Sequence, residues 1–104
     1  MSFDCTIERN GDTLVVVPEG DVDIDNAAVL RQVLQQVIDR GDCPHVEVDM
    51  SSVTFLDSSG LGMLVAARRA AEAKGATLRL SNPGPVVRMV LEVTNLHDSF
   101  VVAK

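Results

Sequence analysis

The sequence predicts an α/β domain with a mixed, mostly parallel sheet and with helices packed on one face of that sheet. Short segments of alternating apolar and polar residues, typical of half-buried strands, are separated by segments with apolar residues at helical spacing. An early Asn-Gly pair indicates a hairpin, and the later strand–helix–strand steps indicate parallel neighbours joined by right-handed crossovers. The expected order is β-β-α-β-α-β-α-β, in one domain over residues 1–104.

Composition limits the classes of function. The chain has 104 residues, of which 46% are hydrophobic, so it can build a core without a metal or a disulfide. The net charge of −6, without a basic patch or aromatic platform, argues against nucleic acid and anionic membranes as partners. No apolar run approaches the ~20 residues that span a bilayer, and the N-terminal segment does not resemble a signal peptide. We therefore expect a cytoplasmic protein.

The first two strands form the expected hairpin. Residues 3–9 alternate apolar and polar side chains, as a half-buried strand does. Asn10-Gly11 favours a tight turn because both positions tolerate a positive φ. Residues 12–18 return as the second strand. Pro18 has no N–H to donate to a ladder, so we expect it at the end of this strand or at an edge position.

The first helix follows an acidic segment. Residues 19–26, EGDVDIDN, are predicted to form a polar loop that ends in a helix cap at Asp25 or Asn26. Apolar residues then repeat at helical spacing until Gly41, which is expected to end the helix. These apolar residues are Leu30, Val33, Leu34, Val37 and Ile38.

The remaining elements complete the alternation. Residues 45–50, HVEVDM, alternate again, whereas a strand covered on both faces reads as continuously apolar. The sheet is therefore expected to have helices on one face only. The sequence predicts a second helix after DSSG, extending to about Lys74, and a strand over residues 76–80. A last short strand is expected over residues 99–104. A third helix is expected after SNPGP, residues 81–85, and so between the strands at 76–80 and 99–104. Its expected buried residues are Val86, Val87, Val90 and Leu91.

The segment DSSGLG, residues 57–62, stands where an apolar run meets the second helix. Asp57 or Ser58 can cap this helix by accepting a hydrogen bond from an otherwise unpaired N–H group. Gly60 and Gly62 keep side chains away from the first turn, which leaves an open, partly positive helix start that suits an anion. A simple cap followed by a flexible turn, with no further role, explains the same residues.

Serine catalysis has little support. A nucleophilic serine needs a base within hydrogen-bond reach and a group that orients the base. The two histidines are His45, expected at the strand end opposite the DSSG turn, and His97, expected after the third helix. Cys5 and Cys43 lack metal-ligand spacing and are expected to be reduced thiols. We expect no enzyme activity, no metal site and no cofactor.

Two motifs carry a family resemblance. FLDSSGLG matches an apolar strand followed by Asp-Ser-(Ser/Thr)-Gly-(Leu/Ile)-Gly at the start of a helix. PEGDVDIDNAAVLRQVL matches a Gly-x-(Val/Leu/Ile)-Asp loop that leads into the first helix. With these motifs, and over almost its whole length, the chain resembles the anti-sigma factor antagonists of the STAS domain family.

The resemblance implies a partner switch. An anti-sigma factor with serine kinase activity phosphorylates such an antagonist, here at Ser58; the unphosphorylated antagonist binds that partner and frees the sigma factor. A metal-dependent serine phosphatase resets the switch, so the antagonist is a ligand and a substrate. The implied contact residues are Gly20, Asp21, Val22 and Asp23 in one loop, and Asp57, Ser59, Gly60, Leu61 and Gly62 at the helix.

The chain also departs from the family pattern, and alternatives remain. Many antagonists continue into a C-terminal helix, whereas this sequence stops at Lys104, so we expect an exposed apolar surface that could receive a partner or a second copy in a homodimer. One alternative function is a STAS module that is not phosphorylated and that serves a small ligand, a transporter or a signalling complex. The other alternative is a serine hydrolase or nucleotidase, which the missing base argues against.

Overall fold

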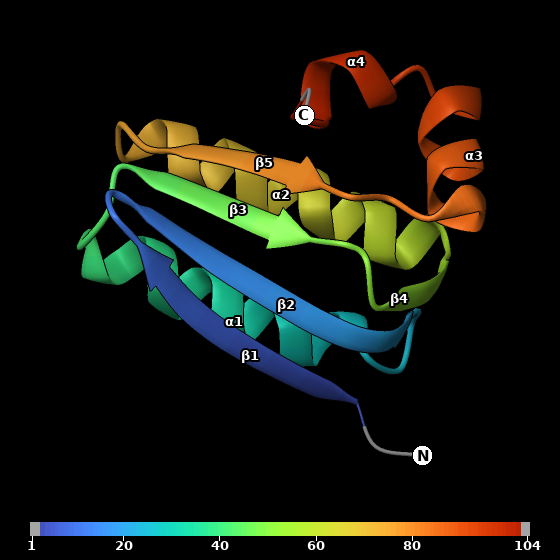
Figure 1. Cartoon of the computed structure of the whole chain (residues 1–104), viewed down its shortest axis with the longest axis horizontal. Helices are drawn as coiled ribbons and strands as arrows, with labels where there is room; N and C mark the ends of the chain where they lie inside the picture. The colour runs from blue at the N-terminus through green and yellow to red at the C-terminus, as the bar shows by residue number, and fades with distance from the viewer. Residues whose placement is uncertain (1–2, 103–104) are drawn as a thin grey trace.

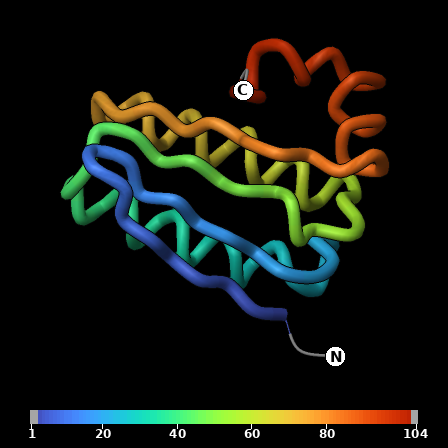
Figure 2. Tube along the Cα trace, viewed as in Figure 1, coloured from blue at the N-terminus to red at the C-terminus, as the bar shows by residue number. Residues whose placement is uncertain are grey.

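The computed structural model describes residues 3–102, and it confirms the α/β fold class (Figures 1 and 2). In chain order the elements are β1 (Asp4–Asn10), β2 (Thr13–Val22), α1 (Ala27–Arg40), β3 (His45–Asp49), β4 (Val53–Leu56), α2 (Ser58–Ala73), β5 (Thr77–Ser81), α3 (Pro85–Val93) and α4 (His97–Phe100). None of these helices is long and apolar enough to cross a membrane.

The strands form one mixed sheet in the order β1-β2-β3-β5, with β4 also paired to β2. Strands β1 and β2 are antiparallel and form the predicted hairpin, but its turn lies at Gly11 and Asp12, because Asn10 still pairs with Thr13. Gly11 has a φ of 65°. The other pairs are parallel. Strand β2 is the longest, so it pairs first with β3, over Thr13–Val16, and then with β4 from Gly20 onward. This arrangement brings the end of β2 beside the strand that leads into α2.

The position of Pro18 corrects one prediction. Pro18 is buried inside β2, and the strand continues to Val22, so the residue marks neither the end nor an edge. The ladder with β3 ends at Val16 and the ladder with β4 begins at Gly20. Pro18 therefore lies between the two parallel ladders, where its missing N–H interrupts neither of them. The predicted acidic loop is correspondingly shorter and begins at Asp23.

Helices α1 and α2 lie side by side across one face of the sheet (Figure 1). The core between them and the strands is almost wholly aliphatic, as the composition predicts. On β3 the side chains of Val46 and Val48 are buried, whereas His45 on the opposite face is exposed. This face of the sheet carries no helix and is open at His45 and Arg79, which agrees with the alternation in the sequence.

The C-terminal segment differs from the prediction. Residues 97–100 form the short helix α4 instead of a strand, and Val101 makes a single parallel bridge with Leu80. The N–H of Val102 donates to the Leu80 carbonyl at 2.8 Å, and residues 103 and 104 lie outside the described part of the chain. In α3 the buried residues are Val87 and Leu91, while Val86 is 43% exposed rather than buried. Phe100, the last residue of this helical turn, is fully buried in the core.

The two cysteines form no disulfide, as expected. Cys43 is buried in the segment before β3, and Cys5 is half-buried in β1. Burial raises the pKa of the Cys5 thiol, because desolvation disfavours the thiolate. Neither thiol therefore has the environment of a reactive cysteine.

Candidate functional site

Ser58 is the first residue of α2, and its side chain is exposed. Strand β4 ends at Leu56, so the chain passes from the carboxyl end of a parallel strand into the helix within two residues. Ligands of open α/β sheets bind at this edge, beyond the carboxyl ends of the strands. The hydroxyl group thus occupies the exposed helix start that the sequence predicts.

Asp57, and not Ser58, caps the helix. Asp57 Oδ1 accepts a hydrogen bond from the Gly60 N–H at 2.9 Å, which satisfies one unpaired donor of the first turn. Asp57 Oδ2 accepts from the Ile24 N–H at 3.2 Å. One carboxylate therefore holds both the helix start and the segment that follows β2.

The first amides of α2 are open. The Leu61 N–H donates to the Asp57 carbonyl, and the Gly60 N–H is held by the Asp57 side chain. Within residues 3–102, the N–H groups of Ser58 and Ser59 have no hydrogen-bond partner. Free amides at the positive end of a helix dipole accommodate an anion.

The second predicted segment lies next to α2 because β2 pairs with β4. Asp21 is opposite Phe55 and Val22 is opposite Leu56 in the parallel ladder. Gly20 has a φ of 112°, a conformation that favours glycine, and the register shifts between Gly20 and Asp21. Val22 is fully buried, so its side chain supports the segment from within.

The N-cap of α1 is Asn26, one of the two predicted residues, but Asp23 supplies the side-chain acceptor at the entry into the helix. Asp23 Oδ1 accepts from the Asp25 N–H at 3.0 Å and from the Asn26 N–H at 3.1 Å. Asn26 occupies the cap position but makes no capping bond, and its side chain donates to the Asp21 carbonyl at 2.9 Å. The segment 21–26 is therefore held in one shape by hydrogen bonds to its own backbone.

An acidic hollow of about 440 Å³ lies in this segment. Its lining includes Asp21, Asp23 and Asp25, with Phe3 at one side and Thr54 of β4 at another. The Thr54 hydroxyl donates to Asp21 Oδ1 at 2.6 Å. The carboxylates of this hollow give the segment a negative charge, which suits a basic partner surface.

The two glycines of the DSSGLG segment have different roles. Gly60 is buried, and a Cβ atom there would collide with the Val22 carbonyl oxygen and lie 2.7 Å from Val22 Cγ1. Gly62 is exposed, and a Cβ atom there would meet nothing within 4 Å. Gly60 is therefore required for packing α2 against the end of β2, whereas packing does not explain Gly62. A helical glycine costs about 0.5–1 kcal/mol relative to alanine, and no close packing contact at Gly62 offsets that cost.

The predicted site residues thus divide by exposure. Val22, Gly60 and Leu61 are buried and shape the site from within. The surface is formed by the exposed Ser58, Ser59 and Gly62 and by the partly exposed Gly20, Asp21, Asp23 and Asp57. Sequence reasoning missed Ile24, whose side chain is 73% exposed and whose N–H binds Asp57. The sequence feature that could have identified Ile24 is its position as a single aliphatic residue between Asp23 and Asp25.

The histidines lie away from the serines. His45 is at the start of β3, the strand end opposite α2's first turn, and its Nδ1 is 2.8 Å from Thr77 Oγ1. His97 begins α4, and its Nδ1 is 3.3 Å from Asp98 Oδ1. Neither histidine hydrogen-bonds to Ser58 or Ser59. The geometry therefore offers these hydroxyl groups no histidine base.

The comparison with known families agrees with this geometry. The family model described as "Mlab, STAS domain" matches residues 5–103. The chain belongs to the STAS domain family.

Relatives of this STAS domain include regulatory proteins. The anti-sigma F factor antagonist of Paenibacillus polymyxa is 25% identical over 96 residues, which cover 92% of this chain and 82% of the relative. The crystal structure of an anti-sigma factor antagonist from Mycobacterium paratuberculosis is 26% identical, with a TM-score of 0.87 over 99% of this chain and 87% of that chain. The Bacillus protein SpoIIAA, solved in its phosphorylated form, shares the fold with a TM-score of 0.74 and 24% identity, over 97% and 92% of the two chains.

Replacing Asp57 with alanine tests the capping geometry of the STAS domain. We expect Asp57→Ala to lower the free energy of unfolding by about 0.5–2 kcal/mol, because Gly60 and Ile24 each lose an acceptor. Asp57→Asn keeps one side-chain oxygen, and asparagine is as good a cap as aspartate, so its loss should be smaller. Urea denaturation measures the free energy of unfolding of both variants. Equal losses in the two variants would contradict the capping role.

Proposed function

We propose that the protein is an anti-sigma factor antagonist in a bacterial partner-switching pathway. Its unphosphorylated form binds an anti-sigma factor that has serine kinase activity, and this binding releases the sigma factor. Phosphorylation of Ser58 prevents binding, and a serine phosphatase restores it. In this role the protein is a ligand and a substrate in the cytoplasm, and it is not an enzyme.

One observation carries the proposal. Ser58 is exposed at the first position of α2, beside two free amides and beside the carboxylate-rich segment 21–26. A kinase can reach this hydroxyl group without unfolding the domain. The relatives named anti-sigma factor antagonists, and the phosphorylated form of SpoIIAA, support the same function.

The electrostatics explain how one phosphate can switch docking. Phosphorylation adds about 1.5–2 negative charges at neutral pH. On the free protein, the amides of Ser58 and Ser59 and the helix dipole stabilise this charge, so the fold need not change. In a docked complex, the phosphate is desolvated next to Asp57 and near Asp23. Each close like-charge contact near a surface costs on the order of 1–4 kcal/mol, so docking weakens by about a hundredfold or more.

Gly62 supports a protein partner at this surface. Gly62 lies four residues after Ser58, so both residues lie on the same face of α2. Because Gly62 has no side chain, the backbone of a partner protein can approach the helix closely there. Glycine has a lower helix propensity than alanine, so this position costs the helix some stability. The exposed Ile24, whose N–H donates to Asp57, adds an apolar side chain of the kind that interfaces bury.

Phosphorylation and binding are tested together. The protein is incubated with Mg-ATP and candidate anti-sigma factor kinases, and peptide mass spectra are searched for the roughly 80 mass units of a phosphoryl group. Modification should occur at Ser58, should be lost in Ser58→Ala and should persist in the matched control Ser59→Ala. Calorimetric titration should give tight binding for Ser58→Ala under phosphorylating conditions, and binding weaker by about a hundredfold for Ser58→Asp.

The same titration tests the docking surface. Gly62→Arg places a long side chain in open space, so the fold should be retained while partner binding falls by about tenfold or more. If Ser58→Ala, Ser58→Asp and the wild type all bind alike under phosphorylating conditions, the switch is wrong. That result would favour the alternative function, a STAS accessory module that is not phosphorylated and that serves a small ligand, a transporter or a signalling complex.

A further inference from the structure

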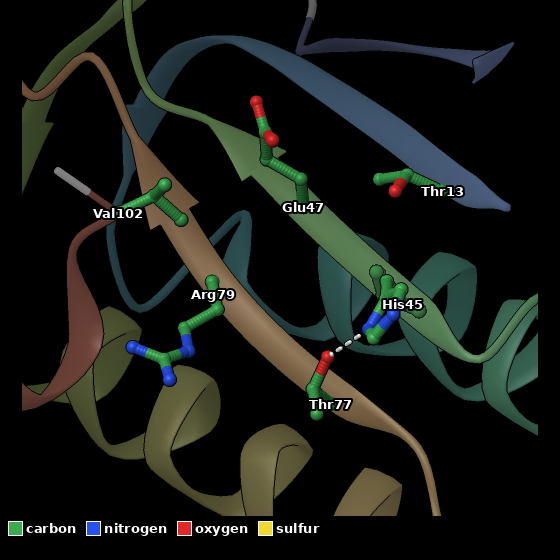
Figure 3. Close-up of a pocket in the computed structure, with 7 residues that line it drawn as sticks. Thr13, His45, Glu47, Thr77, Arg79 and Val102 are labelled. Atoms are coloured by element: carbon green, nitrogen blue, oxygen red, sulfur yellow. Dashed lines mark hydrogen bonds between the residues drawn. The ribbon is translucent and has the colours of Figure 1, made fainter. Parts of the chain in front are cut away.

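A second hollow lies on the face of the sheet that carries no helix, at the end opposite Ser58. Its volume is about 290 Å³, close to the lower limit of about 300–1,000 Å³ for small-molecule sites. His45 and Thr77, the first residues of β3 and β5, line one part of it (Figure 3). Ser58 follows the carboxyl end of β4, so the two sites lie at opposite ends of the parallel strands.

A cross-strand charge pair is separated at this hollow. Glu47 and Arg79 are register partners on β3 and β5, where opposite charges usually attract each other. Figure 3 shows the two side chains pointing apart. Glu47 Oε2 accepts instead from the Ser81 hydroxyl at 2.7 Å. The Arg79 guanidinium makes no hydrogen bond or ion pair with any residue from 3 to 102.

The remaining polar groups of the hollow are already engaged. His45 Nδ1 is 2.8 Å from Thr77 Oγ1, and His45 Nε2 is 3.8 Å from Asp12 Oδ2. Asp12 Oδ1 also accepts from the Thr13 hydroxyl at 3.3 Å. The two acidic groups near the hollow, Asp12 and Glu47, are thus each bound to donors of the protein itself. Arg79 is the charged lining side chain that is left to bind a ligand.

An apolar wall completes the hollow. Val102 lies beside β5 because its N–H donates to the Leu80 carbonyl, and its side chain faces the hollow from the side of Arg79 (Figure 3). Val46 is a second apolar residue of the lining. A ligand that fits here combines an apolar body with one anionic group. Arginine binds a carboxylate through two parallel hydrogen bonds, which fixes the orientation of the ligand.

The geometry points to a binding site for a small organic carboxylate on the open face of the sheet, with the carboxylate on Arg79 and the apolar body against Val102 and the His45 ring. The site is separate from the proposed phosphorylation switch and does not depend on it.

Amide chemical shifts measured by NMR test the site with three probes. Benzoate has an anionic group and an apolar body, benzyl alcohol has only the body, and inorganic phosphate has only the charge. Up to about 10 mM, benzoate should give saturable shifts at the amides of His45, Thr77 and Arg79, and both other probes should bind at least about tenfold more weakly. Arg79→Gln should weaken benzoate binding by at least about tenfold.

The matched control is Arg69→Gln, which removes the same charge from an exposed position on α2. This variant should bind benzoate as the wild type does, and so should Ser58→Ala. Thermal melting shows whether each variant keeps its fold. The proposal is overturned if benzoate gives no saturable shift at these amides, if Arg79→Gln and Arg69→Gln bind it equally, or if phosphate binds as well as benzoate.

Discussion

Gly60→Ala is expected to destabilise the protein by about 1–3 kcal/mol or more, because the new methyl group overpacks the start of α2. The Cβ atom would collide with the Val22 carbonyl oxygen and lie 2.9 Å from Leu56 Cδ1. A backbone oxygen cannot move aside as a flexible side chain can, so α2 must shift away from β2. Domains of this size have about 5–15 kcal/mol of total stability, and urea denaturation will resolve the loss.

Gly62→Ala is the matched control, since it makes the same chemical change two residues further along the helix. Its Cβ atom would lie in open space, so the free energy of unfolding should stay the same or rise by up to about 1 kcal/mol through helix propensity. A loss at Gly62 as large as that at Gly60 would mean that the close contacts of Gly60 do not cause the destabilisation, because helix propensity alone favours alanine at both positions. No loss at either position would mean that the helix start adjusts freely, and the site geometry described here would be wrong.

The regular elements were predictable because their periodicity is local. The alternation over residues 45–50 correctly gave one buried face and one open face of β3. Helix α1 ends at Gly41, which has a φ of 65°, as the stop signal in the sequence predicts. A strand's buried face and a helix's end are both encoded by residues that are neighbours in the sequence, so the periodicity of a single sequence is enough to predict them.

The irregular features depend on contacts that are distant in the sequence. The expected order β-β-α-β-α-β-α-β contains no separate strand between residues 45–50 and the second helix, because the turn at Ser51 and Ser52 carries no glycine or proline; the structure has β4 there. The sequence predicts Pro18 at a strand end or an edge because nothing local shows that β2 changes its parallel partner there. Tertiary pairing decides both cases.

The candidate site shows the same division. The position of Ser58 at an exposed helix start followed from the sequence, since the DSSG turn is a local signal. The hydrogen bond from the Ile24 N–H to Asp57 joins residues 33 positions apart. That Arg79 forms no ion pair within residues 3–102 could not be predicted either, since opposite charges across two strands are expected to pair.

Phe100→Ala is expected to have the largest effect on stability, a loss of about 3–5 kcal/mol in the free energy of unfolding. Phe100 is fully buried, and it is the largest of the fully buried side chains. Its ring also lies under Arg68 of α2, with the guanidinium carbon 4.3 Å from the ring centroid. The short helix α4 has little intrinsic stability, so this side chain holds the C-terminal segment on the sheet.

The matched variant Phe100→Leu keeps an apolar side chain in the core and should lose much less, because only part of the volume is removed. Urea denaturation of both variants separates loss of packing from loss of the aromatic ring, to which Arg68 adds about 0.5–1 kcal/mol. If Phe100→Ala is as stable as the wild type, the ring is not in the core, and α4 is not docked as described. In that case the strand that the sequence predicts over residues 99–104 would again be the better description of this segment.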